Sequence, residues 1–260
     1  MALLTVRNLT KRFAGLAANS DISLSIPEGC LFAVIGPNGA GKTTFFNMVS
    51  GFLAPTAGTI EFAGEDITHL RQDKIAAKGL VRTFQLVQLF KGMTVAENVE
   101  VGCHLATRGG VGAALCRMAW FRRQEADVHA RARELLAFVG LAGQAELDAE
   151  LLPYGQQRLL EVARALAAQP RLLLLDEPAA GLNAHETDAL AAVIQELNRR
   201  GTTVLLIEHD MALVTRIAQR IAVLDFGCKI TEGTPDEIKR HPDVIAAYLG
   251  TEEAAHAQHG

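Results

Sequence analysis

The sequence predicts an α/β fold with a mostly parallel β-sheet, an antiparallel β portion at its N-terminus and an inserted helical lobe. Unbroken apolar runs at residues 31–35, 172–175 and 203–207 show no alternation, as in parallel strands covered on both faces. Segments compatible with helices follow these runs, so the strands are joined by right-handed crossovers. A chain of 260 residues that is 49% hydrophobic can bury a large core.

The antiparallel portion is expected at the N-terminus, and the first 84 residues contain several short strands besides the first apolar run. Residues 3–9 and 22–26 alternate between apolar and polar side chains, which indicates two strands joined by a loop that contains Phe13. Residues 58–64 form a short strand bounded by glycines, and residues 81–84 form another.

Helical periodicity replaces the strand pattern from about residue 85. We expect a helical lobe over residues 86–169, inserted into the α/β core of a single domain spanning residues 1–260. A basic run with Arg108, Arg117, Arg122 and Arg123 surrounds Trp120 in this lobe. A solvated helix face explains this run better than contact with lipid headgroups or an acidic partner. The expected helices are residues 94–101, 124–139 and 156–168 in the lobe and residues 184–200 beyond it, and the last expected strand is residues 221–224.

A glycine-rich loop follows the first apolar run and opens a helical segment. The loop, Gly36 to Thr44, fits the pattern G-x-x-x-x-G-K-[ST] of a P-loop NTPase core. Backbone N–H groups in such a loop surround phosphates, the helix N-terminus adds positive potential, and Lys42 adds a mobile charge. Thr43 is placed to bind Mg²⁺. The expected nucleotide contacts are Gly36, Asn38, Gly39, Ala40, Gly41, Lys42, Thr43 and Thr44.

Polar side chains occupy the carboxyl ends of two other buried strands. Asp176 and Glu177 follow residues 172–175, and His209 follows residues 203–207. Because open α/β sheets bind ligands at this edge, we expect Asp176 to hold Mg²⁺ directly or through water and Glu177 to act as the base that activates water. His209 is a candidate for a hydrogen bond to the γ-phosphate. The alternatives are a solvated or helix-capping acidic pair and a structural histidine.

Composition excludes several other classes of function. The formal net charge of -4 gives no general attraction to nucleic acid. Four widely spaced cysteines predict neither a zinc site nor disulfides, and buried reduced thiols are expected. No apolar stretch approaches the ~20 residues that span a bilayer, and the N-terminus lacks the pattern of a signal peptide. We therefore expect any association with a membrane to depend on a partner.

The order of these motifs resembles the ATP-binding cassette of ABC transporters over residues 3 to 250. Residues 36–44 are similar to Walker A and residues 172–176 to Walker B, and the resemblance makes Glu177 the catalytic glutamate and His209 the switch histidine. It also implies that Gln85 is the Q-loop glutamine, a catalytic and Mg²⁺-binding side chain, and that residues 181–183 are the D-loop. Phe13 resembles the aromatic residue that stacks on adenine, although a core phenylalanine explains its spacing equally well.

The signature motif departs from the family pattern. Pro153 stands where the family has serine, while Gly155 and Gln156 still match and are expected to contact nucleotide held by a second cassette. Asn183 stands where many cassettes have aspartate. These departures, the basic insertion and the ending at residues 246–250 resemble the branched-chain amino-acid importer subfamily.

The resemblance implies ATP and Mg²⁺ as cofactors and a working pair of cassettes, either a homodimer or a heterodimer. It implies two membrane permease subunits as partners, an indirect link to a solute-binding protein, and a peripheral place at the cytoplasmic face of the inner (plasma) membrane. The resemblance also implies that the permeases contact the helical lobe and the loop that contains Gln85.

Other readings explain less of the sequence. A GTPase needs an Asn-Lys-x-Asp motif that is absent, and Asp225-Phe226-Gly227 matches a protein-kinase motif by chance. A regulatory module without turnover is disfavoured because Glu177 and His209 are both present. The main alternative is a soluble cassette ATPase that acts on a cytosolic scaffold, as in iron–sulfur cluster assembly.

Overall fold

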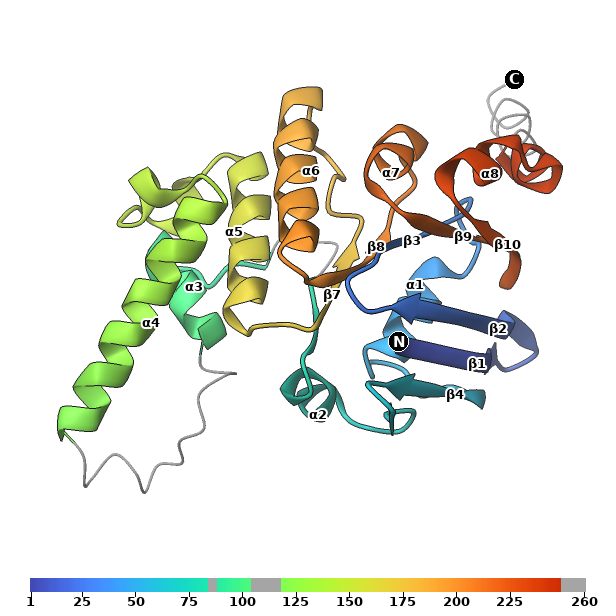
Figure 1. Cartoon of the computed structure of the whole chain (residues 1–260), viewed down its shortest axis with the longest axis horizontal. Helices are drawn as coiled ribbons and strands as arrows, with labels where there is room; N and C mark the ends of the chain where they lie inside the picture. Colours follow the sequence, from blue (N-terminus) through green and yellow to red (C-terminus); the bar gives the residue numbers. More distant parts are fainter. Residues whose placement is uncertain (84–87, 104–117, 249–260) are drawn as a thin grey trace.

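The computed structural model describes residues 1–83, 88–103 and 118–248, with side chains from residue 125 onward in the last range, and confirms the predicted fold class. Figure 1 shows an antiparallel sheet beside a larger, mostly parallel sheet, with α3, α4 and α5 grouped at the opposite end of the molecule. These three helices lie between β6 and β7 in the chain. No helix of the described residues is both long and apolar enough to cross a bilayer.

The two sheets hold strands from distant parts of the chain. The smaller sheet has the order β2-β1-β4-β5, and all its pairs are antiparallel. The larger sheet has the order β10-β9-β3-β8-β7-β6, and only the β10 pair is antiparallel. The strands are β1 (Ala2–Phe13), β2 (Leu16–Pro27), β3 (Leu31–Ile35), β4 (Ala57–Phe62), β5 (Glu65–Asp66), β6 (Leu80–Arg82), β7 (Leu172–Asp176), β8 (Thr203–Ile207), β9 (Arg220–Asp225) and β10 (Cys228–Gly233).

Helices cover both faces of the larger sheet. They are α1 (Lys42–Val49), α2 (Gln72–Ala77), α3 (Val95–Cys103), α4 (Met118–Phe138), α5 (Tyr154–Ala167), α6 (Ala184–Arg199), α7 (Met211–Ile217) and α8 (Pro235–Arg240). Short 3₁₀ turns at Ala142–Gln144 and Ala149–Leu151 connect α4 to α5.

Strand β3 is buried on both faces, as its apolar run predicts. Phe32 and Val34 pack in a core with Phe45 and Phe46 of α1 and with the antiparallel sheet. Ile35 and the other alternate residues of β3 join a second core, built with α5, α6 and α7. All residues of β3, β7 and β8 are buried, so the β3 carboxyl end that carries the phosphate loop is fixed by packing on two sides.

The first two strands are longer than the alternation predicts. They form a continuous hairpin in which Phe13 pairs with Leu16, so Phe13 ends β1 and does not lie in a long loop. Several register shifts interrupt the pairing of these two strands. At such bulges a strand can continue although its apolar and polar side chains no longer alternate. Asn19 illustrates this, because it lies in β2, is fully buried and donates to the Gly41 carbonyl.

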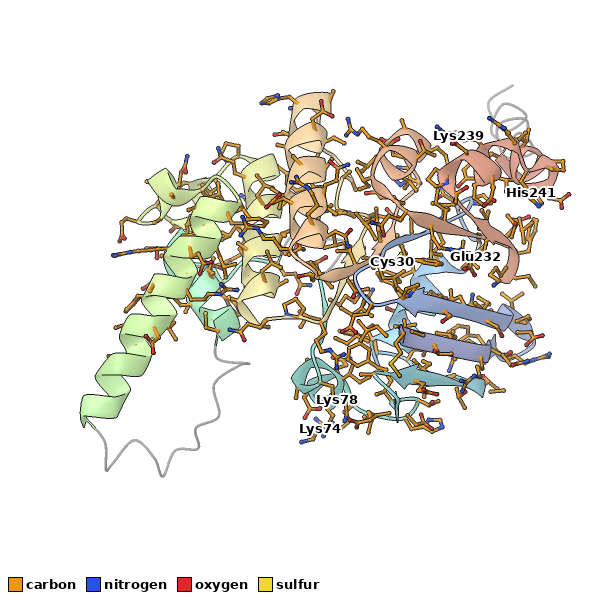
Figure 2. The ribbon with its side chains drawn as sticks, viewed as in Figure 1. Cys30, Lys74, Lys78, Glu232, Lys239 and His241 are labelled. Atoms are coloured by element: carbon orange, nitrogen blue, oxygen red, sulfur yellow. The ribbon has the colours of Figure 1, made fainter. Side chains whose placement is uncertain are left out.

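Other expectations have mixed outcomes. Cys30, which Figure 2 labels, and Cys103 are buried, as expected, and burial raises the pKa of both thiols. Cys228 is exposed, because it begins β10 directly after a surface turn.

Helix α5 begins at Tyr154, two residues before the expected start at Gln156, because Pro153 is pre-organised to precede a first turn. Gln85, the basic side chains in 108–123 and the tail from residue 251 lie outside the described residues.

Candidate functional site

A hollow of about 420 Å³ opens over the phosphate loop at the carboxyl edge of the parallel sheet. Lys42, Thr43, Thr44 and Glu177 line one part of it. Apolar residues line another part, where β2 and the β9–β10 turn approach the loop. The full lining is Leu16, Ala17, Ala18, Asn38, Gly39, Ala40, Gly41, Lys42, Thr43, Thr44, Glu177, Phe226 and Gly227. One opening is thus lined by polar groups of the phosphate loop together with apolar residues of β2 and the β9–β10 turn.

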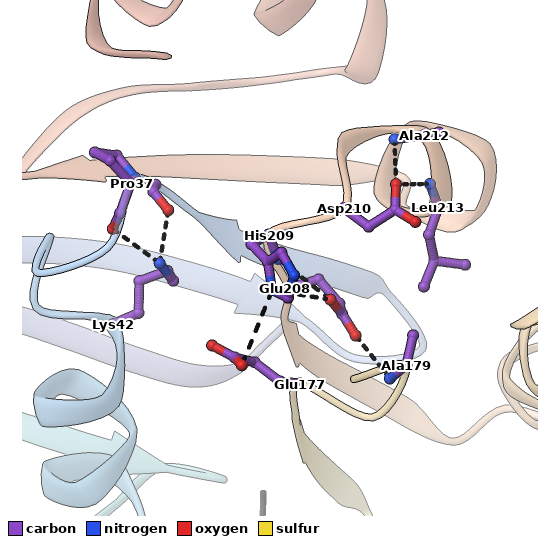
Figure 3. A network of polar contacts seen from close by, with 10 residues as sticks. Pro37, Lys42, Glu177, Ala179, Glu208, His209, Asp210, Ala212 and Leu213 are labelled. Atoms are coloured by element: carbon purple, nitrogen blue, oxygen red, sulfur yellow. Dashed lines mark hydrogen bonds and ion pairs between the residues drawn. The ribbon is translucent and has the colours of Figure 1, made fainter. Parts of the chain in front are cut away.

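The Lys42 ammonium bends back over its own loop. Its Nζ donates to the backbone oxygens of Gly36 at 2.6 Å and Pro37 at 3.0 Å. Figure 3 shows Lys42 turned toward Pro37. Burial lowers the pKa of Lys42, and the carboxylates of Glu177, Asp176 and Glu208 oppose that shift. A buried ammonium held only by carbonyl oxygens can exchange them for phosphate oxygens, which are stronger partners.

Glu177 and His209 come together from two adjacent strands. The Nδ1 atom of His209 lies 3.9 Å from Oε2 of Glu177 (Figure 3), and about four-fifths of the Glu177 side chain is buried. The backbone of Glu177 has φ of 45°, and its N–H donates to the Ile207 carbonyl at 3.0 Å. A non-glycine residue in this conformation is uncommon, and it aims the carboxylate into the hollow beside Lys42.

Glu208 fixes the turn that follows Glu177. Its Oε1 accepts from the Ala179 N–H at 2.8 Å, and its Oε2 accepts from the His209 N–H at 3.2 Å (Figure 3). The residue is fully buried, and desolvation raises the pKa of its carboxyl group against these two hydrogen bonds. One carboxylate therefore connects the segment after β7 to the segment after β8.

Asp176 lies behind the hollow in a buried ion pair. Nη2 of Arg82 donates to Oδ2 of Asp176 at 2.7 Å, and the two side chains are only 8% and 3% exposed. Arg82 also donates to Asn47 and Ser50 at the end of α1, and its guanidinium lies over the ring of Phe52. Arg82 therefore links β6, α1 and the carboxyl end of β7.

Comparison with known proteins identifies the chain. The family model described as ABC transporter matches residues 19–180, more than half of the chain. The chain belongs to the ABC transporter ATP-binding family. It is an ATP-binding cassette, as its motif order indicates, and the family is one of ATPases. A second model, described as branched-chain amino acid ATP-binding cassette transporter, matches residues 228–254.

Curated relatives cover nearly the whole cassette. The high-affinity branched-chain amino acid transport ATP-binding protein BraF of Pseudomonas aeruginosa is 49% identical over 95% of this chain and 98% of its own. The corresponding protein LivG of Escherichia coli is 47% identical over the same shares. These relatives give no support to the alternative of iron–sulfur assembly.

Solved cassettes share the fold. The ADP conformation of the ATP-binding cassette MJ1267 is 32% identical, has a TM-score of 0.84, and the match covers 96% of this chain and 99% of that one. The dimeric cassette MJ0796 bound to ADP and Pi is 26% identical, with a TM-score of 0.75, over 89% of this chain and 98% of that one.

The structure groups most of the expected site residues of the cassette, but not all of them. The loop residues from Asn38 to Thr44 and Glu177 line the hollow, His209 adjoins it, and Gly36 contacts Lys42 at its base. Phe13 does not line it; its ring lies 5.3 Å from the Lys11 ammonium instead. Asp176 is directed at Arg82, because β6 carries that guanidinium alongside β7.

Gly155 and Gln156 lie in the first turn of α5 and do not line this chain's own hollow. A Cβ atom on Gly155 would lie 2.5 Å from Oε1 of Glu186, a residue that forms a capping box with Asn183 at the start of α6. The preceding Tyr154 donates its hydroxyl to the Ala180 carbonyl at 3.3 Å. The signature segment of the cassette is thus packed against the segment that follows Glu177.

Sequence reasoning missed the roles of Arg82 and Glu208. Arg82 is a charged residue at the end of a short buried strand, directly ahead of the segment with Gln85. Glu208 stands beside His209 at the end of a strand whose residues are all buried. In both cases the available signal was a charge at the carboxyl end of a buried strand, since a charge there must find a partner.

Proposed function

We propose that this chain is the ATP-hydrolysing subunit that powers an importer of branched-chain amino acids. The observation that carries the proposal is the match, over 95% of the chain, to proteins named as branched-chain amino acid transport ATP-binding proteins. The match of residues 228–254 to the subfamily model supports it independently of the Walker motifs. Glu177 and His209 beside the phosphate loop supply the groups that hydrolysis needs.

Hydrolysis would use groups from three strand ends. Lys42 and the loop N–H groups bind the phosphates of ATP and stabilise the charge that develops during phosphoryl transfer. The Glu177 carboxylate orients and deprotonates the attacking water, which contributes about 10²- to 10⁴-fold in rate. His209 donates a hydrogen bond to the γ-phosphate, and Glu208 holds the His209 backbone in place.

The residues present fit a Mg²⁺ ion that travels with the nucleotide. No group of three His, Cys, Asp or Glu side chains among the described residues is arranged to hold a metal. Mg²⁺ commonly keeps waters and is bound by one or two protein groups together with substrate phosphates. Thr43 would bind it directly, and Asp176 would act through water because its Oδ2 is engaged by Arg82. The ion neutralises charge on the phosphates when bound.

A second cassette would complete the site. Gly155 and Gln156 lie outside the hollow of their own chain, and the similar cassette MJ0796 is a dimer in the form bound to ADP and Pi. We propose that α5 presents its first turn to nucleotide held by a partner cassette, which is either a second copy or a different subunit. The pair would sit peripherally at the cytoplasmic face of the membrane beneath two permease subunits, which receive solute from a binding protein.

The permeases would dock at the lobe formed from residues 86–169. A groove of about 580 Å³ separates β6 from α3 and α5, and Leu89, Val101 and Ala165 contribute apolar surface to it. Phe90 beside them is 44% exposed. An amphipathic helix from a permease would bury these side chains, and the groove begins at Arg82, the buried partner of Asp176.

The test is to isolate the chain from membranes in its native complex and to measure ATP-driven leucine uptake by vesicles that carry that complex. We expect two hydrophobic permeases to be isolated with it and uptake to be lost in Lys42→Ala. The Lys42→Ala chain should also bind ATP more weakly than wild type, because phosphate charge loses its mobile cation. A soluble scaffold in place of the permeases, or full uptake by Lys42→Ala, would refute the proposal.

A further inference from the structure

A short helix follows α8 and packs against the core below the phosphate loop. It spans residues 242–248. Val244 is 3% exposed and belongs to the core that contains Ile35 of β3, and Tyr248, one helical turn further along, packs against the same core. Ile245 lies off this face and is 45% exposed. One face of the helix is therefore docked on the core that supports the strand leading into the phosphate loop.

The hydroxyl of Tyr248 meets the first residue of the phosphate loop. Burial raises the pKa of Tyr248 to about 12, and a hydrogen bond from the Gly36 backbone N–H opposes that rise. A hydroxyl taken out of water needs such a partner, because leaving it without one is costly. The last described residue of the chain thus reaches the loop that is expected to bind the phosphates.

Gly36 is also the residue that holds Lys42. Its carbonyl accepts from the Lys42 Nζ at 2.6 Å. A Cβ on Gly36 would lie 2.1 Å from the Leu224 oxygen, and φ of 152° also favours glycine, so β9 fixes this residue from one side. When Lys42 exchanges carbonyl oxygens for phosphate oxygens, Gly36 loses its side-chain contact. The contacts with β9 and with Tyr248 then keep the start of the loop in place.

The helix lies in the part of the chain that the subfamily model matches. The general ABC transporter model covers residues 19–180, whereas the branched-chain model covers residues 228–254. The contact between Tyr248 and Gly36 therefore joins the phosphate loop to a segment outside the match to the general model. Neither Walker motif accounts for a tyrosine at this point.

We propose that Tyr248 is a positioning residue of the nucleotide site: it holds Gly36 in the conformation that binds phosphate and couples docking of the C-terminal helix to nucleotide binding. This proposal rests on the proposed binding of nucleotide phosphates at Lys42. A preorganised loop binds its ligand more tightly, because less ordering is needed on binding. By linkage, bound nucleotide must stabilise the docked helix by the same factor by which the helix strengthens nucleotide binding.

The first measurement removes the hydroxyl and keeps the ring. We would measure equilibrium binding of ATP to the full chain and to Tyr248→Phe, Ile245→Ala and Lys42→Ala, each checked for its unfolding midpoint. Tyr248→Phe should weaken ATP binding by roughly 3- to 10-fold, as expected for the loss of one buried hydrogen bond. Ile245→Ala changes an exposed side chain of the same helix and should bind ATP as the wild type does.

A tyrosine that only packs would change the unfolding midpoint and not the affinity. Unchanged ATP affinity in Tyr248→Phe, with or without a lower midpoint, would therefore overturn the positioning role. Equal weakening in Ile245→Ala would overturn it too, because the effect would then not depend on the hydroxyl.

Amide hydrogen exchange of the wild type tests the coupling without any substitution. Residues 242–248 should exchange more slowly when ATP is bound, and Tyr248→Phe should reduce this slowing. If ATP leaves their exchange unchanged while Lys42→Ala binds ATP more weakly than the wild type, the coupling is refuted and the phosphate site stands. Wild-type binding of ATP by Lys42→Ala would instead refute the proposed phosphate site.

Discussion

Replacing Arg82 by methionine should destabilise the fold far more than replacing an exposed arginine. Methionine keeps the apolar contacts of the chain stem but leaves the Asp176 carboxylate buried without the guanidinium that lies 2.7 Å away. Removing one partner of a buried ion pair costs about 3–5 kcal/mol. Arg82 also donates to Asn47 and Ser50, so Arg82→Met should lower the free energy of unfolding by an amount in the upper part of this range. A typical domain has only about 5–15 kcal/mol of stability.

Arg7 is the matched control. Its Nη1 bonds to Glu61 across two strands at 3.1 Å, but these side chains are 61% and 37% exposed. An exposed pair contributes about 0–1 kcal/mol, so Arg7→Met should unfold almost as the wild type does. Urea unfolding followed by circular dichroism measures both free energies.

The double variant Arg82→Met with Asp176→Asn tests the electrostatic part of this argument. Removing the orphaned charge should recover part of the loss caused by Arg82→Met alone. Equal destabilisation by Arg82→Met and Arg7→Met, or no recovery in the double variant, would show that the Arg82 to Asp176 pair contributes no more than a surface contact.

Three further predictions concern the catalytic edge and the signature helix. Glu177→Gln should retain ATP affinity but lose about 10²- to 10⁴-fold in single-turnover hydrolysis, because the amide cannot accept a proton; wild-type turnover would contradict this. Burial raises the pKa of Glu208 above its ordinary value of 4.5, so the folded state binds the Glu208 proton more tightly than the unfolded state does. The free energy of unfolding of the wild type should therefore fall relative to that of Glu208→Gln as pH rises from 4.5. A constant difference between the two free energies of unfolding across that pH range would contradict this prediction. Gly155→Ala should lower the free energy of unfolding by about 1–3 kcal/mol, because the added methyl group overpacks against Glu186. In the double variant, Glu186→Ala should relieve part of that loss. Strictly additive changes in the free energy of unfolding would refute the contact.

The contact between Gly155 and Glu186 complicates the use of Gly155→Asp to test whether two cassettes share a nucleotide site. An aspartate at position 155 would meet the Glu186 carboxylate of its own chain as well as any phosphate held by a partner. Lost hydrolysis in Gly155→Asp would therefore have two sources. Unfolding of the isolated chain separates them, since the clash with Glu186 needs no partner.

Local pattern was sufficient to predict the parallel core. The apolar runs that became β3, β7 and β8 fill both faces of each strand, so burial follows from composition alone. The glycine-rich loop and the strand-end residues Glu177 and His209 were also predictable, because parallel strands bring their carboxyl ends to one edge. The family resemblance extended this to α5, whose first turn carries the signature.

Contacts between distant segments were not predictable. The partnership of Arg82 with Asp176 joins residues 94 positions apart, and no periodicity encodes which buried charges meet. Phe226 was set aside as part of a chance motif because nothing local shows that its turn lies against the loop at Ala40. The sequence likewise could not show that the ring of Phe13 lies 5.3 Å from the Lys11 ammonium at the end of β1, and its contact with adenine stays a prediction.

The position of β3 in the sheet determines when the nucleotide site can form during synthesis. β3 is complete at Ile35, but its two neighbours, β8 and β9, end at Ile207 and Asp225. At ~5–20 residues per second the ribosome needs roughly 10–40 s to make the intervening chain. Until β8 has been made, the five consecutive apolar residues of β3 have neither of their neighbouring strands to pair with. The ability to bind ATP should therefore appear only when the last third of the chain has emerged, and a nascent chain stalled before β8 should be a strong target for chaperones.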